Sequence, residues 1–331
     1  MRQLRARVIG MRWAGLIVLL CAGSAAAETH HAADQKQPGG KKADAKKADP
    51  NVPNEFTDDP VVGRGARING EEVTGLVAFT FDDGPNPETT PAVLDALKKY
   101  DVPATFFIVT RRLVGKVGEK PREVLAREMA EGHLVESHSV THAHLGRADA
   151  KKLDKEMNKS FEMLSTEAKR PIGMFRAPFG ALGGAGRVRL KKLGVTEVFW
   201  SIDTLDWRAR KADKLRKKVM AMIVKQKGGV VLMHDVKPIT AAIIGDVLDD
   251  LEAENCRRLA AKEEPLWPVS IHYFIRDGKV PRAVPDDVAK RTEAYKKALP
   301  GRCAMRPLAA PVAPAPASAP QNQPKPPTPA P

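Results

Sequence analysis

Beyond its amino terminus, the 331-residue sequence has no long apolar run. Residues 1–27 combine a basic start, an apolar stretch from Leu16 to Leu20 and small residues ending at Ala27, which is typical of a secretory signal peptide (1–27). The alternative, a transmembrane anchor, is disfavoured because the uncharged stretch is shorter than the roughly 20 residues that span a bilayer. We therefore expect an exported chain, periplasmic or extracellular, without stable membrane insertion after cleavage.

Cysteine is also scarce, with three residues in the whole sequence. Cleavage of the signal would remove Cys21 and leave Cys256 and Cys303. This pair is compatible with one disulfide in an oxidising compartment. Two unpaired thiols remain an equal alternative at this point, because the sequence alone does not show that the two residues meet.

No stripe of alternating basic and aromatic residues and no nucleic-acid-binding motif is present, although the formal net charge is +14. We therefore expect no nucleic-acid partner. A positive surface favours attraction to anionic polymers, including cell-wall and envelope material. No internal repeat is evident, and we expect a monomer.

Large apolar residues are almost absent from both ends of the mature chain. Residues 28–65 are rich in Lys, Ala, Asp, Gly and Pro, a composition too polar to offset the entropy of ordering. The segment from Ala309 to Pro331 consists mainly of Pro and Ala, which favours extended conformations. We therefore expect a flexible leader (28–65), one catalytic domain (66–300) and a disordered tail (301–331).

Short apolar runs alternate with amphipathic stretches in the central region. The expected strands are Leu76–Phe81, Ala104–Val109, Gly173–Phe175, Thr196–Trp200, Gly229–Met233 and Val269–Phe274. The expected helices are Thr90–Tyr100, Pro121–Glu131, Asp149–Thr166, Gly186–Leu193, Ala212–Lys225 and Ile239–Glu254. Repeated strand and helix units predict an α/β fold with a parallel sheet, open or closed into a barrel. In such a barrel, the chemistry takes place at the carboxyl ends of the strands.

Two acidic residues, Asp82 and Asp83, follow the first expected strand directly and precede Gly84 and Pro85. Adjacent carboxylates at the end of a buried strand need a cation or hydrogen-bond donors, and a divalent metal would supply this partner. Asp, Gly and Pro are also turn-forming residues. An ordinary acidic turn therefore remains an alternative for this segment taken alone.

Two histidines, His138 and His142, lie four residues apart, and His144 follows closely. Two imidazoles at this spacing converge on one cation if the backbone between them turns, and imidazole is a common ligand of zinc, nickel and iron. One Asp with two His leaves coordination positions open for water and substrate, as a catalytic metal requires.

Five motifs together resemble the polysaccharide deacetylase family, carbohydrate esterase family four, over roughly Leu76 to Phe274. They are TFDDGP at Thr80–Pro85, HSVTH at His138–His142, FRAPFG at Phe175–Gly180, DTLDW at Asp203–Trp207 and LMHD at Leu232–Asp235. The resemblance implies a distorted (β/α) barrel and the hydrolysis of N-acetyl groups from amino sugars of a polysaccharide, chitin-like or peptidoglycan. It also implies a divalent metal, for which zinc is favoured over cobalt, nickel or iron.

Roles for individual residues follow from the same resemblance. The implied metal ligands are Asp83, His138 and His142. Asp82 is the implied general base, His234 the general acid, and the backbone N–H of Phe179 the donor to the developing oxyanion.

The remaining implied residues support these groups or contact the substrate. A carboxylate close to His234 would raise the pKa of that residue, and Asp206 is the candidate. Arg176 is expected to orient Asp82 or Asp206. Residues expected to contact the substrate are Trp207, Leu232 and Pro178.

The sequence departs from the family pattern at three places: Phe179 replaces the more usual tyrosine, Ala177 replaces a second proline, and Lys237-Pro238 follows the last motif. None of these changes removes a catalytic group. Two alternatives to N-deacetylation remain: O-acetyl esterase activity on a xylan-like polymer, with the same groups, and an inactive carbohydrate-binding barrel.

Overall fold

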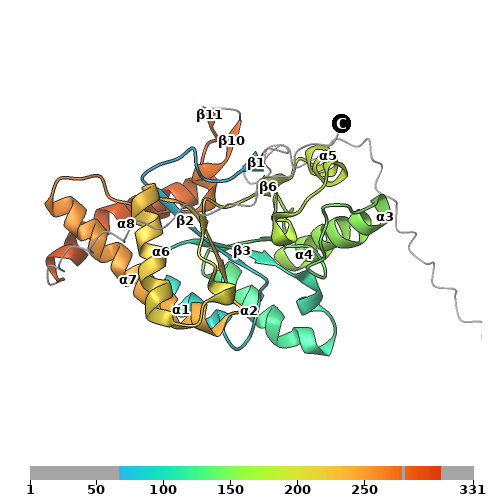
Figure 1. The fold of residues 1–331 in the computed structure, drawn as a ribbon, viewed down its shortest axis with the longest axis horizontal. Helices are drawn as coiled ribbons and strands as arrows, with labels where there is room; N and C mark the ends of the chain where they lie inside the picture. Colours follow the sequence, from blue (N-terminus) through green and yellow to red (C-terminus); the bar gives the residue numbers. More distant parts are fainter. Residues whose placement is uncertain (1–66, 278–279, 307–331) are drawn as a thin grey trace, which may run out of the picture. The chain divides into compact units, whose positions relative to one another are not determined.

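The computed structural model describes residues 67–277 and 280–306 (Figure 1). The expected signal peptide, the flexible leader and the segment from Ala309 to Pro331 lie outside the described residues. The expectations for these segments therefore stay predictions.

Parallel strands form the central sheet of the described chain. They are β1 (Arg67–Ile68), β2 (Leu76–Asp82), β3 (Ala104–Ile108), β4 (Leu134–Ser137), β5 (Met174–Phe175), β6 (Thr196–Val198), β7 (Ile202–Asp203), β8 (Gly229–His234) and β9 (Trp267–Pro268). Their spatial order is β1-β6-β5-β4-β3-β2-β8-β7, and β9 pairs with β2. A short antiparallel pair, β10 (Arg276–Asp277) and β11 (Val280–Pro281), lies apart from this sheet. The parallel sheet predicted from the alternating pattern is confirmed.

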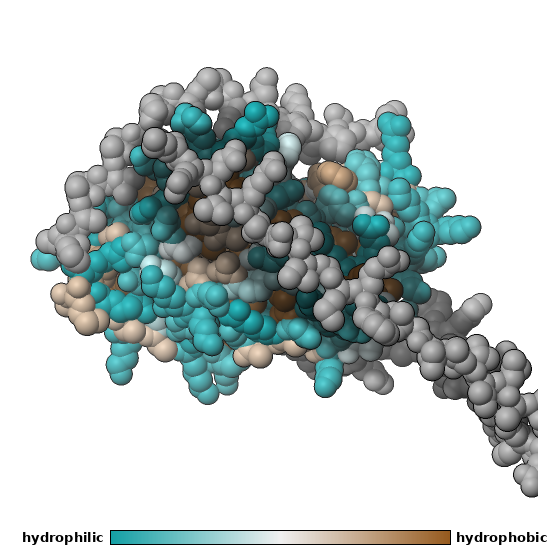
Figure 2. All heavy atoms as spheres, turned by 90° about the horizontal axis from the view of Figure 1, so that it is seen from below, coloured by the Kyte–Doolittle hydropathy of each residue, from teal (hydrophilic) through white to brown (hydrophobic). Residues whose placement is uncertain are grey.

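Helices lie around the sheet (Figure 1). They are α1 (Thr90–Tyr100), α2 (Glu119–Ala130), α3 (Ala150–Leu153), α4 (Lys159–Ala168), α5 (Gly184–Leu193), α6 (Ala212–Gln226), α7 (Pro238–Ala260) and α8 (Asp286–Ala304). A π-helical turn, Asp154–Asn158, joins α3 to α4. Within the described ranges, no helix is long and apolar enough to span a bilayer. Hydrophilic side chains project from much of the described surface that is visible in Figure 2.

Strand β2 is the centre of the sheet, because it pairs with β3, β8 and β9. Side chains alternate between the two faces of a strand. Phe79 and Phe81 pack into the apolar core that contains residues of α1 and α7, whereas Thr80 and Asp82 both contact Arg176 on the other face. The polar side chains of β2 therefore lie on the face of the sheet opposite to α1 and α7, and Asp82 is the last residue of the strand.

Five of the six expected strands form, although their ends shift by up to two residues. The exception is Val269–Phe274. Only Trp267–Pro268 pairs with the sheet in this region, and Ile271–Phe274 form a 3-10 helix. A short apolar run does not distinguish a buried strand from a buried helical turn. Strands β1, β4 and β7 were not predicted as strands, since each contains only two to four residues.

All six expected helices form, but helix α8 extends beyond the predicted end of the domain. It runs from Asp286 to Ala304, so the boundary placed between residues 300 and 301 falls inside it. A disulfide between Cys256 of α7 and Cys303 of α8 ties this helix to the domain. The structure thus decides between the paired and the unpaired cysteines.

Candidate metal and acid–base site

The polar motifs meet at the carboxyl edge of the parallel sheet. Asp82 and His234, the last residues of β2 and β8, are direct neighbours in the register of these two strands. Ser137, the last residue of β4, precedes His138. Because parallel strands bring their carboxyl ends to the same edge, segments more than 150 residues apart in the sequence supply one site.

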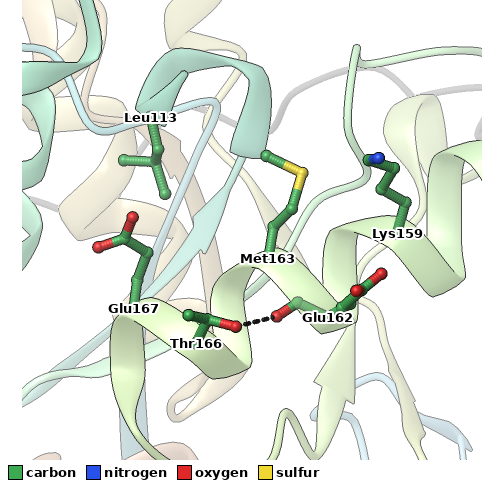
Figure 3. A pocket seen from close by; sticks show the side chains of 6 residues that line it. All are labelled: Leu113, Lys159, Glu162, Met163, Thr166 and Glu167. Carbon is green, nitrogen blue, oxygen red and sulfur yellow. Dashed lines mark hydrogen bonds between the residues drawn. The ribbon is translucent and has the colours of Figure 1, made fainter. Parts of the chain in front are cut away.

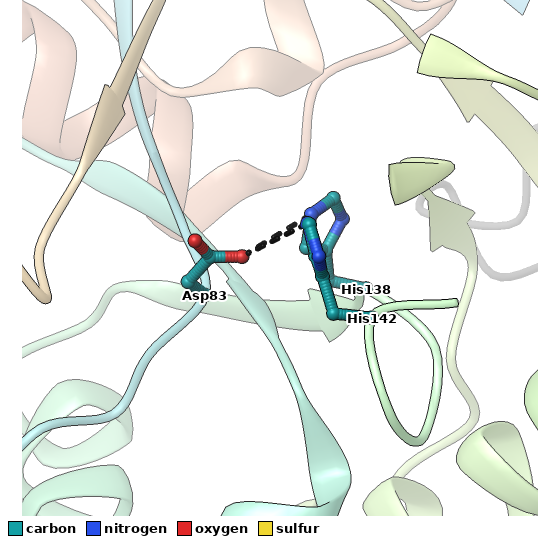
Figure 4. Close-up of side chains that lie close together, drawn as sticks. All are labelled: Asp83, His138 and His142. Atoms are coloured by element: carbon teal, nitrogen blue, oxygen red, sulfur yellow. Dashed lines mark ion pairs between the residues drawn. The ribbon is translucent and has the colours of Figure 1, made fainter. Parts of the chain in front are cut away.

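Asp83, His138 and His142 form a cluster in which one ligand atom of each residue lies within 4.8 Å of the others. The carboxylate oxygen Oδ1 of Asp83 is 3.3 Å from Nε2 of His142 and 3.6 Å from Nε2 of His138. Both imidazoles point toward this carboxylate (Figure 4). His144, the third histidine of the segment, is exposed and is not a member of the cluster.

The backbone around the acidic ligand is held in an unusual conformation. Asp83 has a φ of 78°, a left-handed region that non-glycine residues rarely adopt. Nε of Arg112 donates to the carbonyl oxygen of Asp83 at 2.5 Å, and the N–H of Val109 donates to the carbonyl oxygen of Gly84 at 3.1 Å. The segment after β3 therefore holds the turn that presents Asp83. The role of Arg112 was not predicted, since a lone arginine in a short 3-10 helix carries no sequence signal.

The turn between the two histidines is fixed in a similar way. His142 has a φ of 59°, and its N–H donates to Oγ of Ser139 at 3.0 Å. The buried carboxylate of Glu156, from the π-helical turn, accepts hydrogen bonds from the N–H and the hydroxyl of Thr141 at 2.8 and 2.7 Å. This turn brings the two imidazoles together, as the sequence interpretation required.

His138 is oriented for coordination by its second ring nitrogen. Its Nδ1 lies 2.7 Å from the carbonyl oxygen of Arg176, which makes Nδ1 the protonated nitrogen and leaves the lone pair of Nε2 facing Asp83. Burial lowers the pKa of His138 to about 3. The ring is therefore neutral at pH 7, which is the form that binds a metal.

Asp82 is paired with a fully buried arginine. Nη1 of Arg176 donates to Oδ1 of Asp82 at 2.7 Å and to the hydroxyl of Thr80 at 2.8 Å. Its other nitrogens donate to the carbonyl oxygens of Val198 and Phe199. Burial raises the pKa of Asp82, and the charge of Arg176 opposes this rise. Between the two partners considered for Arg176, the structure selects Asp82.

His234 is held by a second buried carboxylate. Its Nδ1 lies 2.7 Å from Oδ1 of Asp206, and its backbone N–H donates to Oδ2 of Asp206 at 2.7 Å. The hydroxyl of Thr240 donates to the same Oδ2 at 2.5 Å. Burial alone would lower the pKa of His234, but the hydrogen bond and charge of Asp206 outweigh this effect and raise it to about 9. Thr240 was not predicted, because it lies on helix α7 outside every motif.

The expected oxyanion donor and substrate-contacting residues lie on the same edge. Phe179 has a φ of 61°, its side chain is exposed, and its ring centroid is 4.5 Å from that of His142. Pro178 is buried beside it. Trp207 follows Asp206 and has an exposed fraction of 55%, whereas Leu232 on β8 is buried.

Two further carboxyl groups, those of Asp235 and Glu128, are buried, and the sequence predicted no role for either. The hydroxyl of Thr90 donates to Oδ2 of Asp235, and Gly84 packs so closely on this carboxylate that a Cβ at position 84 would collide with Oδ2. Glu128 of α2 is fully buried, and burial, together with the charge of Asp235, raises its pKa well above the ordinary value. Asp235 therefore packs against Gly84 and supports the turn that presents Asp83.

A separate hollow of about 270 Å³ lies between Leu113 and one side of α4 (Figure 3). Its lining carries two carboxylates and one ammonium group, on Glu162, Glu167 and Lys159. None of the lining residues belongs to the cluster of Asp83, His138 and His142. The hollow is thus distinct from the site at the strand ends.

Comparison with known proteins identifies relatives over the region that carries this site. The model of the polysaccharide deacetylase family matches residues 69–198. A chitooligosaccharide deacetylase of Bradyrhizobium sp. (strain ANU 289) is 35% identical over 175 residues, which cover 52% of the chain and 77% of the relative. The peptidoglycan-N-acetylglucosamine deacetylase PgdA of Listeria monocytogenes is 34% identical over 179 residues, which cover 54% of the chain. The chain spans only 36% of the length of this second relative.

Solved structures show the same fold. A peptidoglycan deacetylase from Bdellovibrio bacteriovorus superimposes with a TM-score of 0.51 and 28% identity, covering 57% of the chain and 53% of that protein. The peptidoglycan N-acetylglucosamine deacetylase Bc1960 gives a TM-score of 0.53 and 25% identity, covering 65% and 95%. The distorted (β/α) barrel expected from the five motifs is confirmed.

Proposed function

Because the chain belongs to the polysaccharide deacetylase family, we propose that it hydrolyses N-acetyl groups of amino sugars in a polysaccharide, chitin-like or peptidoglycan, and releases acetate. One observation carries the proposal. The cluster of Asp83, His138 and His142 lies on the same edge as a buried carboxylate and a protonated imidazole. A metal centre, a base and an acid are the groups that amide hydrolysis needs.

The cluster fits a divalent metal ion. Oδ1 of Asp83 is a buried carboxylate oxygen without a hydrogen-bond partner among the described residues, and such an oxygen is costly unless a cation compensates it. Two imidazoles and one carboxylate suit zinc, with cobalt, nickel or iron as alternatives. When bound, the ion would act as a Lewis acid that polarises the acetamide carbonyl.

Asp82 is placed to accept the proton of the attacking water. Its Oδ1 is engaged by Arg176, whereas its Oδ2 lies 3.7 Å from Nε2 of His138, on the side of the metal cluster. One oxygen is thus anchored and the other faces the site. Burial raises the pKa of Asp82, which makes this carboxylate a stronger base than an exposed aspartate.

His234 is placed to protonate the leaving amine. Its Nδ1 is engaged by Asp206, so Nε2 is the nitrogen that can give its proton to the substrate. With a pKa of about 9, the ring carries this proton at pH 7. The backbone N–H of Phe179 would donate to the oxygen of the tetrahedral intermediate, and Trp207, Leu232 and Pro178 would surround the acetylated sugar.

The protonated His234 favours N-deacetylation over the alternative, O-acetyl ester hydrolysis on a xylan-like polymer. An amine is a poor leaving group until it is protonated, whereas an alkoxide departs with less assistance. The second alternative, an inactive carbohydrate-binding barrel, would not need the Asp206–His234 pair or the Arg176–Asp82 pair. Both pairs are formed within the site.

Export to the periplasm or the exterior is part of the proposal, since it would bring a monomeric enzyme to its acetylated polysaccharide. The pattern of residues 1–27 supports this location. So do the names of the four relatives described above, three of which refer to peptidoglycan.

Acetate release from a panel of acetylated glycans, before and after chelation, tests the function. We expect acetate from chitin oligomers or peptidoglycan fragments, a loss of release after chelation, and recovery when a divalent transition metal is added. Release from acetylated xylan alone would establish the esterase instead. Unchanged turnover in a rigorously metal-free sample would refute the metal dependence.

A further inference from the structure

Exposed cations surround the site at the carboxyl edge of the sheet. They lie in the four loops that follow β3, β4, β7 and β8, residues 109–118, 138–149, 204–211 and 235–237. We define the cationic rim as six exposed or half-exposed side chains of these loops: Arg111, Arg112, Arg147, Arg208, Arg210 and Lys237.

Carboxylates that could neutralise the cationic rim are few. Within the four loops, the acidic residues are Asp149, Asp206 and Asp235. Asp149 caps helix α3 by accepting from the N–H of Lys152, and the other two are buried under the site. The neighbouring loop after β2 adds exposed Glu88 and the metal-cluster residue Asp83. The positive charge of these loops thus exceeds the negative charge on their surface.

Arginines elsewhere in the described chain behave differently. Most of them form ion pairs with carboxylates, as Arg127 does with Asp95 and Glu131, and Arg216 with Asp250. No arginine of the cationic rim forms an ion pair within residues 67–277 and 280–306. The guanidinium group of Arg208 stacks near the ring of Trp207 instead, 5.7 Å from its centroid. The rim arginines therefore keep their charge available to a ligand.

The cationic rim also adjoins the catalytic groups. Arg112 contacts the carbonyl oxygen of Asp83, and the N–H of Arg111 donates to the carbonyl oxygen of Val140, in the turn between the two metal-binding histidines. Arg147 lies three residues beyond His144, whose ring stacks on Phe179. A polymer that places its acetamido group in the site therefore passes over these cations.

We propose that the cationic rim binds carboxylates of the polymer and makes the site select an acetylated glycan that carries carboxylates over a neutral one. The proposal rests on the deacetylase function proposed above. Arginine provides planar pairs of donors that match a carboxylate, and a one-sign field around a cleft attracts ligands of the opposite sign. The carboxylates belong either to the sugars or to peptides attached to them.

The positive charge of the whole molecule provides a matched control. Lys191 and Lys192 lie in the last turn of helix α5, and Lys225 lies in the last turn of α6. Both helices lead into strands, so all three lysines lie at the opposite, amino edge of the sheet. They are exposed, as the rim arginines are. Replacing three lysines there changes the net charge as much as replacing three rim arginines.

The experiment compares two triple variants of the metal-loaded, full-length chain. The rim variant carries Arg111→Gln, Arg147→Gln and Arg210→Gln, and the control carries Lys191→Gln, Lys192→Gln and Lys225→Gln. The substrates are a neutral chitotetraose, a peptidoglycan tetrasaccharide without peptides, and the same tetrasaccharide with its peptides. The readouts are kcat/KM for acetate release and the Kd of each glycan, at low salt and at ~0.5 M NaCl, where the screening length falls to a few ångströms.

We expect the wild type to prefer a carboxylated glycan and the rim variant to lose roughly fivefold or more of this preference. The control should retain it, and salt should reduce it. Preference for the peptide-free tetrasaccharide assigns the carboxylates to the sugars, and preference only for the peptide-bearing form assigns them to the peptides. Equal kcat/KM and Kd for all three glycans, or an unchanged preference in the rim variant, overturns the proposal. Charge-dependent binding without acetate release supports the rim and refutes the deacetylase function.

Discussion

The proposed general base and the proposed general acid are each held by a buried partner of opposite charge. We call the Asp82–Arg176 pair the base half of the site and the Asp206–His234 pair the acid half. Around Asp82, the titrating group is a carboxylate held by a fully buried arginine, whereas around His234 the titrating group is an imidazole held by a buried carboxylate. In each half the partner has the opposite charge, and it engages only one of the two polar atoms. Oδ2 of Asp82 and Nε2 of His234 are therefore left for the proposed reaction. Arg176 favours the deprotonated form of Asp82, whereas Asp206 favours the protonated form of His234.

The two halves also differ in what surrounds them. The base half adjoins the metal cluster, since Oδ2 of Asp82 is 3.7 Å from His138. The acid half is built from β8, the loop after β7 and helix α7, with no residue of the cluster. Substitutions of the cluster residues that adjoin the base half should therefore remove the metal, whereas substitutions in the acid half should leave it bound.

The largest effect is expected from removing a ligand next to the base half. His138→Ala should abolish metal binding and acetate release together, because it removes the buried imidazole whose Nε2 faces Asp83. Metal content and acetate release are the measurements. The matched variant His144→Ala, which replaces an exposed histidine outside the cluster, should keep most of both. The reverse outcome would show that the ligands were assigned to the wrong pair of histidines.

Next in size is the effect of removing the base itself. Asp82→Asn keeps the size of the side chain but removes the proton acceptor, so kcat should fall by roughly 10²-fold or more. The metal content should stay close to that of the wild type, because Asp83, His138 and His142 remain. A variant that loses its metal as well would mean that Asp82 is a ligand and that the two aspartates share the ion.

Removing the acid should give a defect that depends on the leaving group. His234→Ala should retain the metal and lose roughly 10²-fold in kcat on an N-acetyl substrate. The defect should shrink on an activated acetyl ester, whose leaving group needs no proton. If Asp82→Asn is spared on the ester and His234→Ala is not, the roles of the two halves are exchanged.

These residues were predictable from the sequence because they lie in short motifs that directly follow strands. Asp82, Asp83, His138, His142 and His234 each belong to such a motif, and the structure brings all five to one edge. The order of helices and longer strands was predictable for a related reason, since an apolar period extends over whole elements.

Support from distant or short elements was not predictable in this way. Thr240, Glu156 and Arg112 contact the site from three separate helical segments, and a single polar residue in such a segment has no recognisable spacing. Strands of two residues, such as β1 and β7, are too short to show alternation. Whether Cys256 and Cys303 pair depends on the packing of α7 against α8, which the sequence does not show.

A smaller effect with a defined sign is expected for the partner of the acid. Asp206→Asn removes the charge that helps to hold the pKa of His234 at about 9. The pKa of His234 should fall, so the basic limb of the pH profile of kcat should move to lower pH, with activity at pH 8 reduced roughly tenfold or more. The pKa of His234 in the folded wild type lies above the usual value near 6.5. The stabilisation from this pair is therefore fully present below about pH 6.5 and is lost as the pH rises through about 9.

Two measurements check this substitution. The pH profile of acetate release should show the shifted limb, and chemical denaturation at pH 6 and pH 10 should show a smaller difference in unfolding free energy for Asp206→Asn than for the wild type. A basic limb that stays in place would mean that another group controls it.

The smallest effect is expected for the outermost residue of the acid half. Thr240→Val removes the hydroxyl that donates to Oδ2 of Asp206 but keeps the charge of this carboxylate. An aspartate with one donor fewer is more basic and attracts the proton of His234 at least as strongly, so the basic limb should stay in place or move to higher pH. This direction is opposite to that expected for Asp206→Asn. Looser orientation of the imidazole should reduce kcat by about two- to tenfold.

Thr204→Val is the matched control for this last variant. Its buried hydroxyl donates to the backbone carbonyl oxygen of Leu232 at 2.7 Å, and it forms no hydrogen bond to Asp206 or His234 within the described part of the chain. Both variants lose one buried hydrogen bond, which costs about 1–3 kcal/mol of unfolding free energy. Only Thr240→Val should change the ratio of rates on the N-acetyl substrate and the activated ester, because only this residue acts on the acid. Equal ratios in the two variants would mean that Thr240 serves the packing of α7 and that Asp206 alone sets the proton affinity of His234.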